Sequence, residues 1–173
     1  MSEHLWPLLR LKADSEEELI GKYKQVYLET YVRDAEGKEV ELYDWNGKRV
    51  YFHAPSFDHA FSESSNYRRG DGVHDLPFSK NRARRIMWIK EVLQASKGNI
   101  ERRSQIRSNT KGQSKKRRSL IVIEERYVVV LQERDKDHQL EFVTAIPADH
   151  GYVEKLRRES ILQERKKPQS FGD

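Results

Sequence analysis

The clearest pattern along the chain is a set of three short apolar runs separated by charged residues. The runs are rich in β-branched and aromatic residues and read LIVI at 120–123, RYVVVLQ at 126–132 and LEFVTAI at 140–146. This composition is typical of β-strands, and the short breaks suit an antiparallel meander. Pro147 closes the third run, because proline cannot continue a central strand.

Helical spacing of apolar residues predicts a first helix that begins after Ser15. Ser15 and Glu18 have the spacing of a capping box, and three consecutive Glu residues favour the positive end of the helix dipole. Apolar residues then recur on one face, so we expect this helix to pack against the protein. The preceding segment LWPLLRL is apolar and fits either a short strand or an anchoring arm.

Two longer helices are predicted later in the chain. Ser79 is expected to cap a helix from residue 80 to about residue 97, which ends near Gly98. Asp149 is expected to cap a final helix over 150–165, whose apolar stripe is thin. A shorter helix is predicted in the segment FDHAFSES, where two Phe residues at positions i and i+4 point their rings into the core.

A β-hairpin is predicted around the Asn-Gly pair at 46–47, between β-like runs at 39–44 and 48–53. This dipeptide is a strong hairpin signal, since both central residues of such a turn need positive φ. Residues 100–107 alternate weakly and are read as a further strand. The segments 62–75 and 108–118 have almost no apolar content and are read as flexible loops, the second of them strongly basic.

Together these elements predict an α+β fold. An antiparallel sheet, a meander of about four strands, packs against helices, and an N-terminal helix and β-hairpin precede it. The expected organisation is an N-terminal extension over 1–53, an α+β domain over 54–167 and a disordered tail over 168–173.

Composition narrows the function. The chain of 173 residues has no Cys, which excludes disulfides, thiolate metal sites and cysteine nucleophiles. No apolar run reaches the roughly 20 residues of a membrane span, and the N-terminus lacks the layout of a signal peptide. We therefore expect a cytoplasmic protein with no membrane partner.

Charge is distributed unevenly along the chain. The formal net charge is +5, yet residues 82–118 hold 13 Lys and Arg against two Glu, a local charge of +11, so the remaining residues sum to −6. Such a concentration favours a polyanionic partner, because each neutralised phosphate releases condensed counterions. A solvated basic loop without a partner is the alternative.

Several enzyme classes lack their motifs in this sequence. Neither common phosphate-binding glycine loop, nor a GxSxG turn, nor a helical HExxH is present. Metal-free cleavage of RNA remains, since it needs a base, cations and an acid that His, Arg, Lys and hydroxyl groups supply without a cofactor. The chain carries such groups in order: His59, then Arg82 and Arg85, then Thr144.

Three segments resemble a known family. FDHAFSES, FSKNRARRIMWIKEVL and EFVTAIPAD look like the phage-associated branch of the barnase–EndoU–colicin–RelE-like ribonuclease superfamily, whose members are mostly metal-independent ribonucleases and often toxins. The resemblance covers roughly residues 52–149 and leaves the N-terminal third unexplained. It implies a helix-plus-antiparallel-sheet fold, RNA as the substrate and no cofactor, and it allows for a neutralising protein partner.

Matched position by position, the resemblance implies that His59 is the general base or acid. Arg82 and Arg85 become phosphate clamps, and Thr144 hydrogen-bonds the scissile phosphate or orients the histidine. The expected nucleic-acid contacts are basic residues between the helix that begins at residue 80 and the meander: Arg102, Arg103, Arg107, Lys111, Lys115, Lys116, Arg117 and Arg118.

Two other functions fit the same residues. One is a nucleic-acid-binding module without catalysis, which binds RNA or DNA through its basic loop at 108–118. The other is a protein-interaction domain whose basic loop docks on an acidic partner. Each of the four catalytic candidates also has an ordinary structural reading, for example a surface histidine or a strand threonine.

Overall fold

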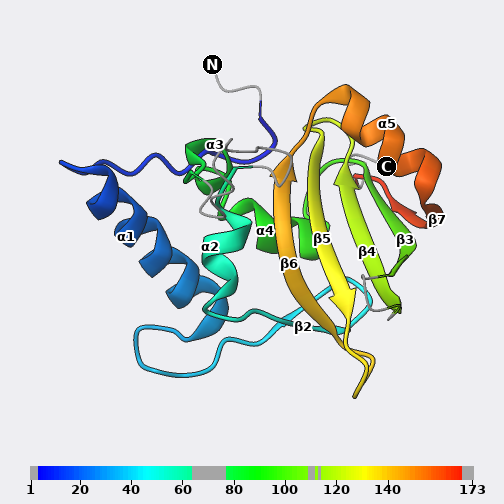
Figure 1. Cartoon of the computed structure of the whole chain (residues 1–173), viewed down its shortest axis with the longest axis horizontal. Coiled ribbons are helices and arrows are strands. Elements are labelled where there is room, and N and C mark those ends of the chain that lie inside the picture. The colour runs from blue at the N-terminus through cyan, green and yellow to red at the C-terminus, as the bar shows by residue number, and fades with distance from the viewer. Residues whose placement is uncertain (1–3, 64–76, 109–111, 113, 169–173) are drawn as a thin grey trace, which may run out of the picture.

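A computed structural model describes residues 4–63, 77–108, 112 and 114–168 (Figure 1). Its centre is one seven-stranded sheet with the order β1-β2-β6-β5-β4-β3-β7. All pairs are antiparallel except β2 and β6, which run parallel. The strands are β1 Leu42–Tyr43, β2 Arg49–Tyr51, β3 Ile100–Ser108, β4 Ser114–Val122, β5 Tyr127–Glu133, β6 Leu140–Pro147 and β7 Ile161–Lys166.

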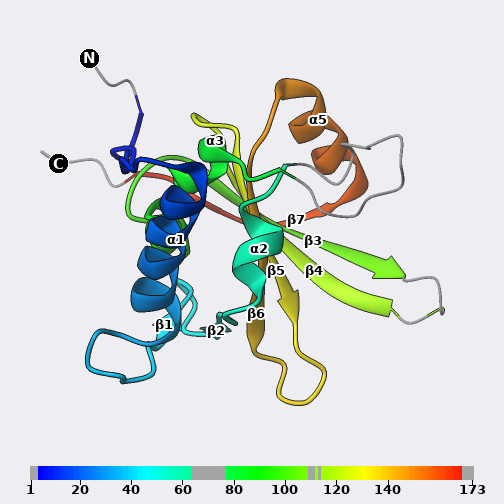
Figure 2. The same ribbon diagram turned by 60° about the vertical axis from the view of Figure 1, so that its left-hand side comes forward.

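The meander β3-β4-β5-β6 and the α+β class are as predicted. The helices are α1 Glu16–Tyr27, continued by a π-helical turn at Leu28–Val32, α2 Ser56–Ala60, α3 Lys80–Ala83, α4 Trp88–Leu93 and α5 His150–Glu159. Figures 1 and 2 show α1, α2 and α4 on one side of the sheet and α5 on the other.

The two faces of the sheet bury different clusters. Alternate strand residues such as Leu120 and Val129 join a large cluster with the helices on the α1 side, rich in aromatic rings. Their neighbours Ile121, Val128 and Val130 pack with α5 in a smaller aliphatic cluster. Residues of 1–53 contribute to the large cluster, so the N-terminal segment shares its core with the sheet.

The predicted helix caps are confirmed for the three main helices. The side chains of Ser15, Ser79 and Asp149 accept hydrogen bonds from the backbone N–H groups of Glu18, Arg82 and Tyr152. The LWPLLRL segment is an anchoring arm: its Leu9 N–H donates to a carbonyl at residue 84, and the indole N–H of Trp88 donates to the carbonyl at residue 7.

The prediction of one continuous helix over 80–97 is wrong, because residues 84–87 form turns between α3 and α4. The carbonyls of three consecutive residues there accept hydrogen bonds from other parts of the chain. Leu9 N–H reaches residue 84, Tyr127 Oη reaches residue 85 and Tyr31 Oη reaches residue 86. Tertiary donors replace the helical ones at this point.

The final helix also differs from its prediction, since it ends at Glu159 and residues 161–166 form β7. The guanidinium of Arg103 donates hydrogen bonds to the carbonyls of Arg157 and Ser160. Carbonyls at the end of α5, which lack helical partners, are paired in this way. The chain then pairs with β3 at the sheet edge.

The basic loop predicted over 108–118 is largely strand. Ser114–Arg118 begin β4 and pair in register with the end of β3, which leaves only 109–113 between the strands. Backbone pairing therefore overrides the low apolar content of this segment. The loop predicted over 62–75 and the tail over 168–173 fall mostly outside the described residues.

The hairpin at 46–47 forms with a different turn. Its strands are shorter than predicted. Of the two central turn residues, Gly47 has positive φ, at 82°, and Asn46 does not. The Asp44 carboxylate accepts the N–H groups of Asn46 and Lys48 and shapes the turn instead.

Candidate functional site

A cleft of about 650 Å³ opens on the α5 side of the sheet. Its floor is formed by β4, β5 and β6, with Arg117, Val130 and Thr144 among the lining residues. One wall is α5, and the other carries His59 from α2 and Arg82 from α3. Three of the four predicted catalytic residues thus line one cleft, although 85 residues of sequence separate the first from the last.

Packing of α2 sets the position of His59. Phe57 and Phe61 are each 1% exposed and hold the helix against the core, as their spacing predicts. His59 lies on an exposed face of α2 and lines the cleft. Both α2 and α3 pack on β6, whose outer edge pairs with β2 only at Leu140 and Glu141. The rest of that edge is therefore free to meet the two helices.

Arg82 is almost fully buried in the wall of the cleft, at 8% exposure. Its guanidinium donates to the carbonyl of Ala60, 3.3 Å away, which places it next to the residue that follows His59. Burial lowers the pKa of Arg82, while the charge of Glu63 and the Tyr152 phenol act in the opposite direction. The guanidinium stays charged at neutral pH, so it presents a poorly solvated cation to the cleft.

Thr144 lies where the register between β5 and β6 shifts. Val130 pairs with Thr144 and Leu131 with Phe142, so β6 carries one extra residue at Val143. Bulges of this kind re-aim side chains and are frequent beside active sites. Thr144 is 7% exposed, and its Oγ1 finds no hydrogen-bond partner among the described residues. An unpaired buried hydroxyl costs about 1–3 kcal/mol, so Thr144 Oγ1 is an unsatisfied polar atom of a residue that lines the cleft.

Arg85 lies outside the cleft. Its guanidinium stacks over the Trp88 ring at 4.9 Å and donates to both the carbonyl and the side-chain oxygen of Asn81. The resemblance implied that Arg82 and Arg85 both clamp phosphate, but only Arg82 lines the cleft.

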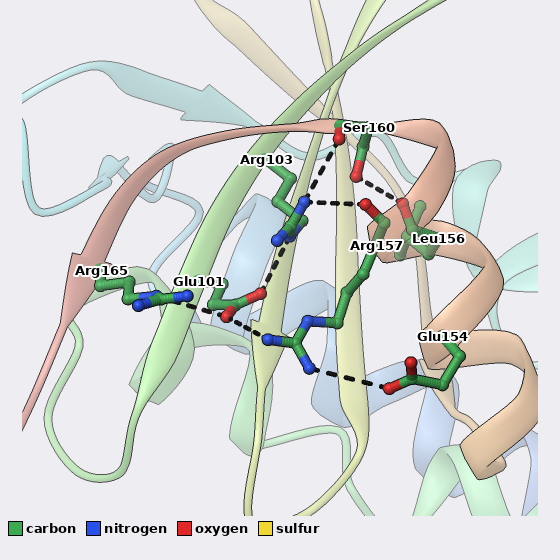
Figure 3. A network of polar contacts seen from close by, with 7 residues as sticks. All are labelled: Glu101, Arg103, Glu154, Leu156, Arg157, Ser160 and Arg165. Atoms are coloured by element: carbon green, nitrogen blue, oxygen red, sulfur yellow. Dashed lines mark hydrogen bonds and ion pairs between the residues drawn. The ribbon is translucent and has the colours of Figure 1, made fainter.

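Several of the eight predicted nucleic-acid contacts are engaged within the protein. Arg102 pairs with Glu164, and Arg118 pairs with Glu133 and donates to Gln163. Arg103 is buried (8% exposed) in the polar network of Figure 3.

In that network the Glu101 carboxylate binds Arg103, Arg157 and Arg165 and joins β3, α5 and β7. Burial alone would raise the pKa of Glu101, but the hydrogen bonds and charges of Arg103 and Arg157 lower it below its ordinary value. This network holds α5 in place as one wall of the cleft.

The remaining basic candidates divide between the cleft and the β3–β4 hairpin. Arg117 lines the cleft. Lys115 and Lys116 lie on the hairpin, where Lys115 pairs with Asp135 at 2.6 Å and Lys116 is exposed. Lys111 and the side chain of Arg107 lie outside the described residues.

Sequence reasoning missed the contribution of α5. This helix adds Tyr152, Lys155 and Glu159 to the cleft, and Glu63 and Asp149 complete its acidic groups. The sequence did show the buried stripe of the helix, which includes Val153 and Leu156. Residues next to a buried stripe lie at the edge of the surface on which the helix packs. The stripe was therefore the sequence signal for the α5 residues that line the cleft.

Comparison of the chain with protein-family models, curated proteins and solved structures finds no match. The family resemblance therefore rests on its three motifs and stays a prediction. Within the part of the chain that the structure describes, every helix is too short or too polar to span a bilayer.

Proposed function

We propose that the protein is a metal-independent endoribonuclease and that the cleft under α5 is its active site. The observation that carries this proposal is that His59, Arg82 and Thr144 line a single cleft together with Arg117. These residues supply an imidazole, two guanidiniums and a hydroxyl. Groups of this kind can cleave a phosphodiester without a cofactor.

In the proposed reaction His59 removes the proton of a ribose 2′-hydroxyl. The 2′-oxygen attacks the adjacent phosphorus and the bond to the 5′-oxygen breaks. A water molecule protonates that leaving oxygen, and the His59 imidazolium gives its proton back to the solvent. The products are a 2′,3′-cyclic phosphate and a 5′-hydroxyl. Arg82 and Arg117 stabilise the charge on the phosphoryl oxygens, and Thr144 donates its hydroxyl to one of them.

The proposal includes RNA as partner and a cytoplasmic location, and it leaves room for a neutralising protein. Arg85 has no contact with substrate in it, because the structure places this residue outside the cleft.

The test is incubation of purified protein with total RNA in EDTA. We expect cleavage that is unaffected by the chelator and His59→Ala to be slowed at least about 10²-fold, the effect of losing one general base. His53→Ala is the matched control, since His53 is a half-exposed histidine that pairs with Glu141 outside the cleft. Equal rates for wild type and His59→Ala would remove the histidine from the mechanism.

A second candidate is a nucleic-acid-binding module without catalysis. The observation in its favour is the β3–β4 hairpin, which projects from the body of the molecule in Figure 2 and carries Lys115, Lys116 and Arg117. It predicts intact RNA after long incubation and binding that weakens steeply with salt. Lys116→Gln should reduce the slope of that salt dependence by about one.

A further inference from the structure

One residue of the cleft has a side chain that neither the proposed reaction nor the core uses. Tyr152 lies in the first turn of α5, lines the cleft and is 37% exposed. It is the only Phe, Tyr or Trp among the described residues that line the cleft. The neighbours Val153 and Leu156 are 6% and 7% exposed and fix α5 to the sheet, so the position of the tyrosine is set.

The ring of Tyr152 has no partner within the described part of the chain. Every one of the 13 close ring pairs and all three stacked guanidiniums involve other aromatic residues. The hydroxyl has no hydrogen bond there either, whereas those of Tyr23, Tyr27 and Tyr31 each donate to a backbone carbonyl. Tyr152 is partly exposed and lines the cleft, so its ring is accessible to a ligand there.

Charged groups of both signs share the cleft with the ring, the cations of Arg82 and Lys155 among them and the carboxylates of Glu63, Asp149 and Glu159 beside them. Lys155 follows Tyr152 by three residues, which puts both side chains on one face of α5, and Lys155 also lines the cleft. Arg82 lies on the opposite wall of the same cleft. A flat apolar ring between cations is the arrangement with which proteins bind single-stranded nucleic acid, since the base stacks and the flanking phosphates meet the cations.

We infer that Tyr152 is a stacking platform for one unpaired base of the substrate, so that the cleft takes single-stranded RNA and rejects duplex. In a duplex the bases are stacked on each other and offer no free face to a side chain. The inference rests on the proposed function, and it adds both the substrate class and a specificity residue to it.

The experiment measures RNA binding in the His59→Ala protein in EDTA, so that cleavage does not consume the ligand. The probe is a short fluorescein-labelled single strand, compared with the duplex of the same sequence. Tyr152→Phe keeps the ring, and Tyr152→Leu removes it. Tyr43→Leu is the matched control, because Tyr43 is 46% exposed on β1, outside the cleft.

We expect the single strand to bind at least about 10-fold more tightly than the duplex. Tyr152→Phe and Tyr43→Leu should leave the dissociation constant unchanged, and Tyr152→Leu should raise it about 10-fold, as loss of one stacked base does. A strand with one abasic position should bind more weakly to the tyrosine protein, and this penalty should vanish in Tyr152→Leu if that position is the stacked one. Strands with the abasic position moved along the sequence locate it.

The outcomes separate the inference from the proposed function. If wild type cleaves RNA and Tyr152→Leu binds the single strand as tightly as its parent, the platform is wrong and the nuclease stands. Equal affinity for strand and duplex also overturns the inference. If no RNA is bound or cleaved, the proposed function fails and the inference fails with it. Circular dichroism of each variant confirms that α5 is retained.

Discussion

The two faces of the central sheet are made by alternate residues of the same strands, yet they differ in how they are completed. On the α1 side, aromatic rings fill the space, with the Tyr31 and Phe52 rings stacked 4.6 Å apart. On the α5 side, five buried aliphatic residues of the described part of the chain form a cluster, and the cleft of about 650 Å³ lies beside it.

Polar groups follow the same division. The buried tyrosine hydroxyls of the α1 side donate to backbone carbonyls within the protein. Among the described residues of the α5 side, the Arg82 guanidinium has a single long hydrogen bond and Thr144 Oγ1 has none. Unpaired buried polar groups are costly. The chain satisfies the tyrosine hydroxyls of the α1 side, whereas these two groups of the α5 side are incompletely satisfied within the described residues.

The largest expected effect comes from a substitution in the core on the α1 side of the sheet. Trp88 is fully buried and contacts the rings of His4, Trp6 and Tyr127. Trp88→Ala should lower the free energy of unfolding by about 3–5 kcal/mol through lost burial and a residual cavity. Leu156→Ala on the α5 side should lower the free energy of unfolding less, by about 2 kcal/mol, because a site beside a cleft can relax. Urea denaturation measures both, and equal losses would contradict the difference between the faces.

The next effect concerns the part of the α5 side where polar groups are paired. Glu101→Gln should cost about 3 kcal/mol of unfolding free energy, because it leaves Arg103 buried without its partner. The folded-state pKa of Glu101 lies below its ordinary value of 4.5, so its stabilisation is complete above that pH and is lost as pH falls through the folded pKa.

The difference in unfolding free energy between wild type and Glu101→Gln should therefore become smaller as pH falls below about 4.5. Thermal unfolding at several pH values measures it. A gap that is constant with pH would show that the carboxylate charge is not what holds α5 to β3 and β7.

A third prediction sharpens the role of the cleft. Arg82→Met should slow RNA cleavage about 10²-fold, the loss typical of one preorganised charge donor, without lowering the free energy of unfolding, since a buried cation is replaced by an apolar chain. Arg85→Met is the matched control and should change the cleavage rate little, because Arg85 lies outside the cleft. Equal losses in the two variants would move the reacting phosphate away from Arg82.

The smallest expected effect on stability lies at Thr144. Thr144→Val removes a buried hydroxyl that has no partner among the described residues, so the free energy of unfolding should stay the same or rise by up to about 1 kcal/mol. Cleavage should fall about 10-fold if the hydroxyl donates to the phosphate. A destabilised Val variant with normal activity would assign Thr144 to the core.

Local signals in the sequence predicted much of this architecture. Ser15, Ser79 and Asp149 begin their helices as expected, because a cap needs only the residue and the turn that follows it. The three apolar runs fall in the end of β4 and in β5 and β6, since period and β-branching report on strands directly. Of the candidate site, His59, Arg82, Thr144 and Arg117 were named in advance.

The sequence by itself determined where α1, α3 and α5 begin, through their capping residues, and that the apolar runs of β4, β5 and β6 are strands. Tertiary structure alone decided where they end and which side chains meet. Tyr31 and Leu9 interrupt the helix after Ala83, the edge of β3 turns residues 161–166 into a strand, and α5 brings Tyr152 to the cleft. The physical reason is that capping and periodicity act over a few residues, whereas these outcomes depend on donors and edges that come from distant parts of the chain.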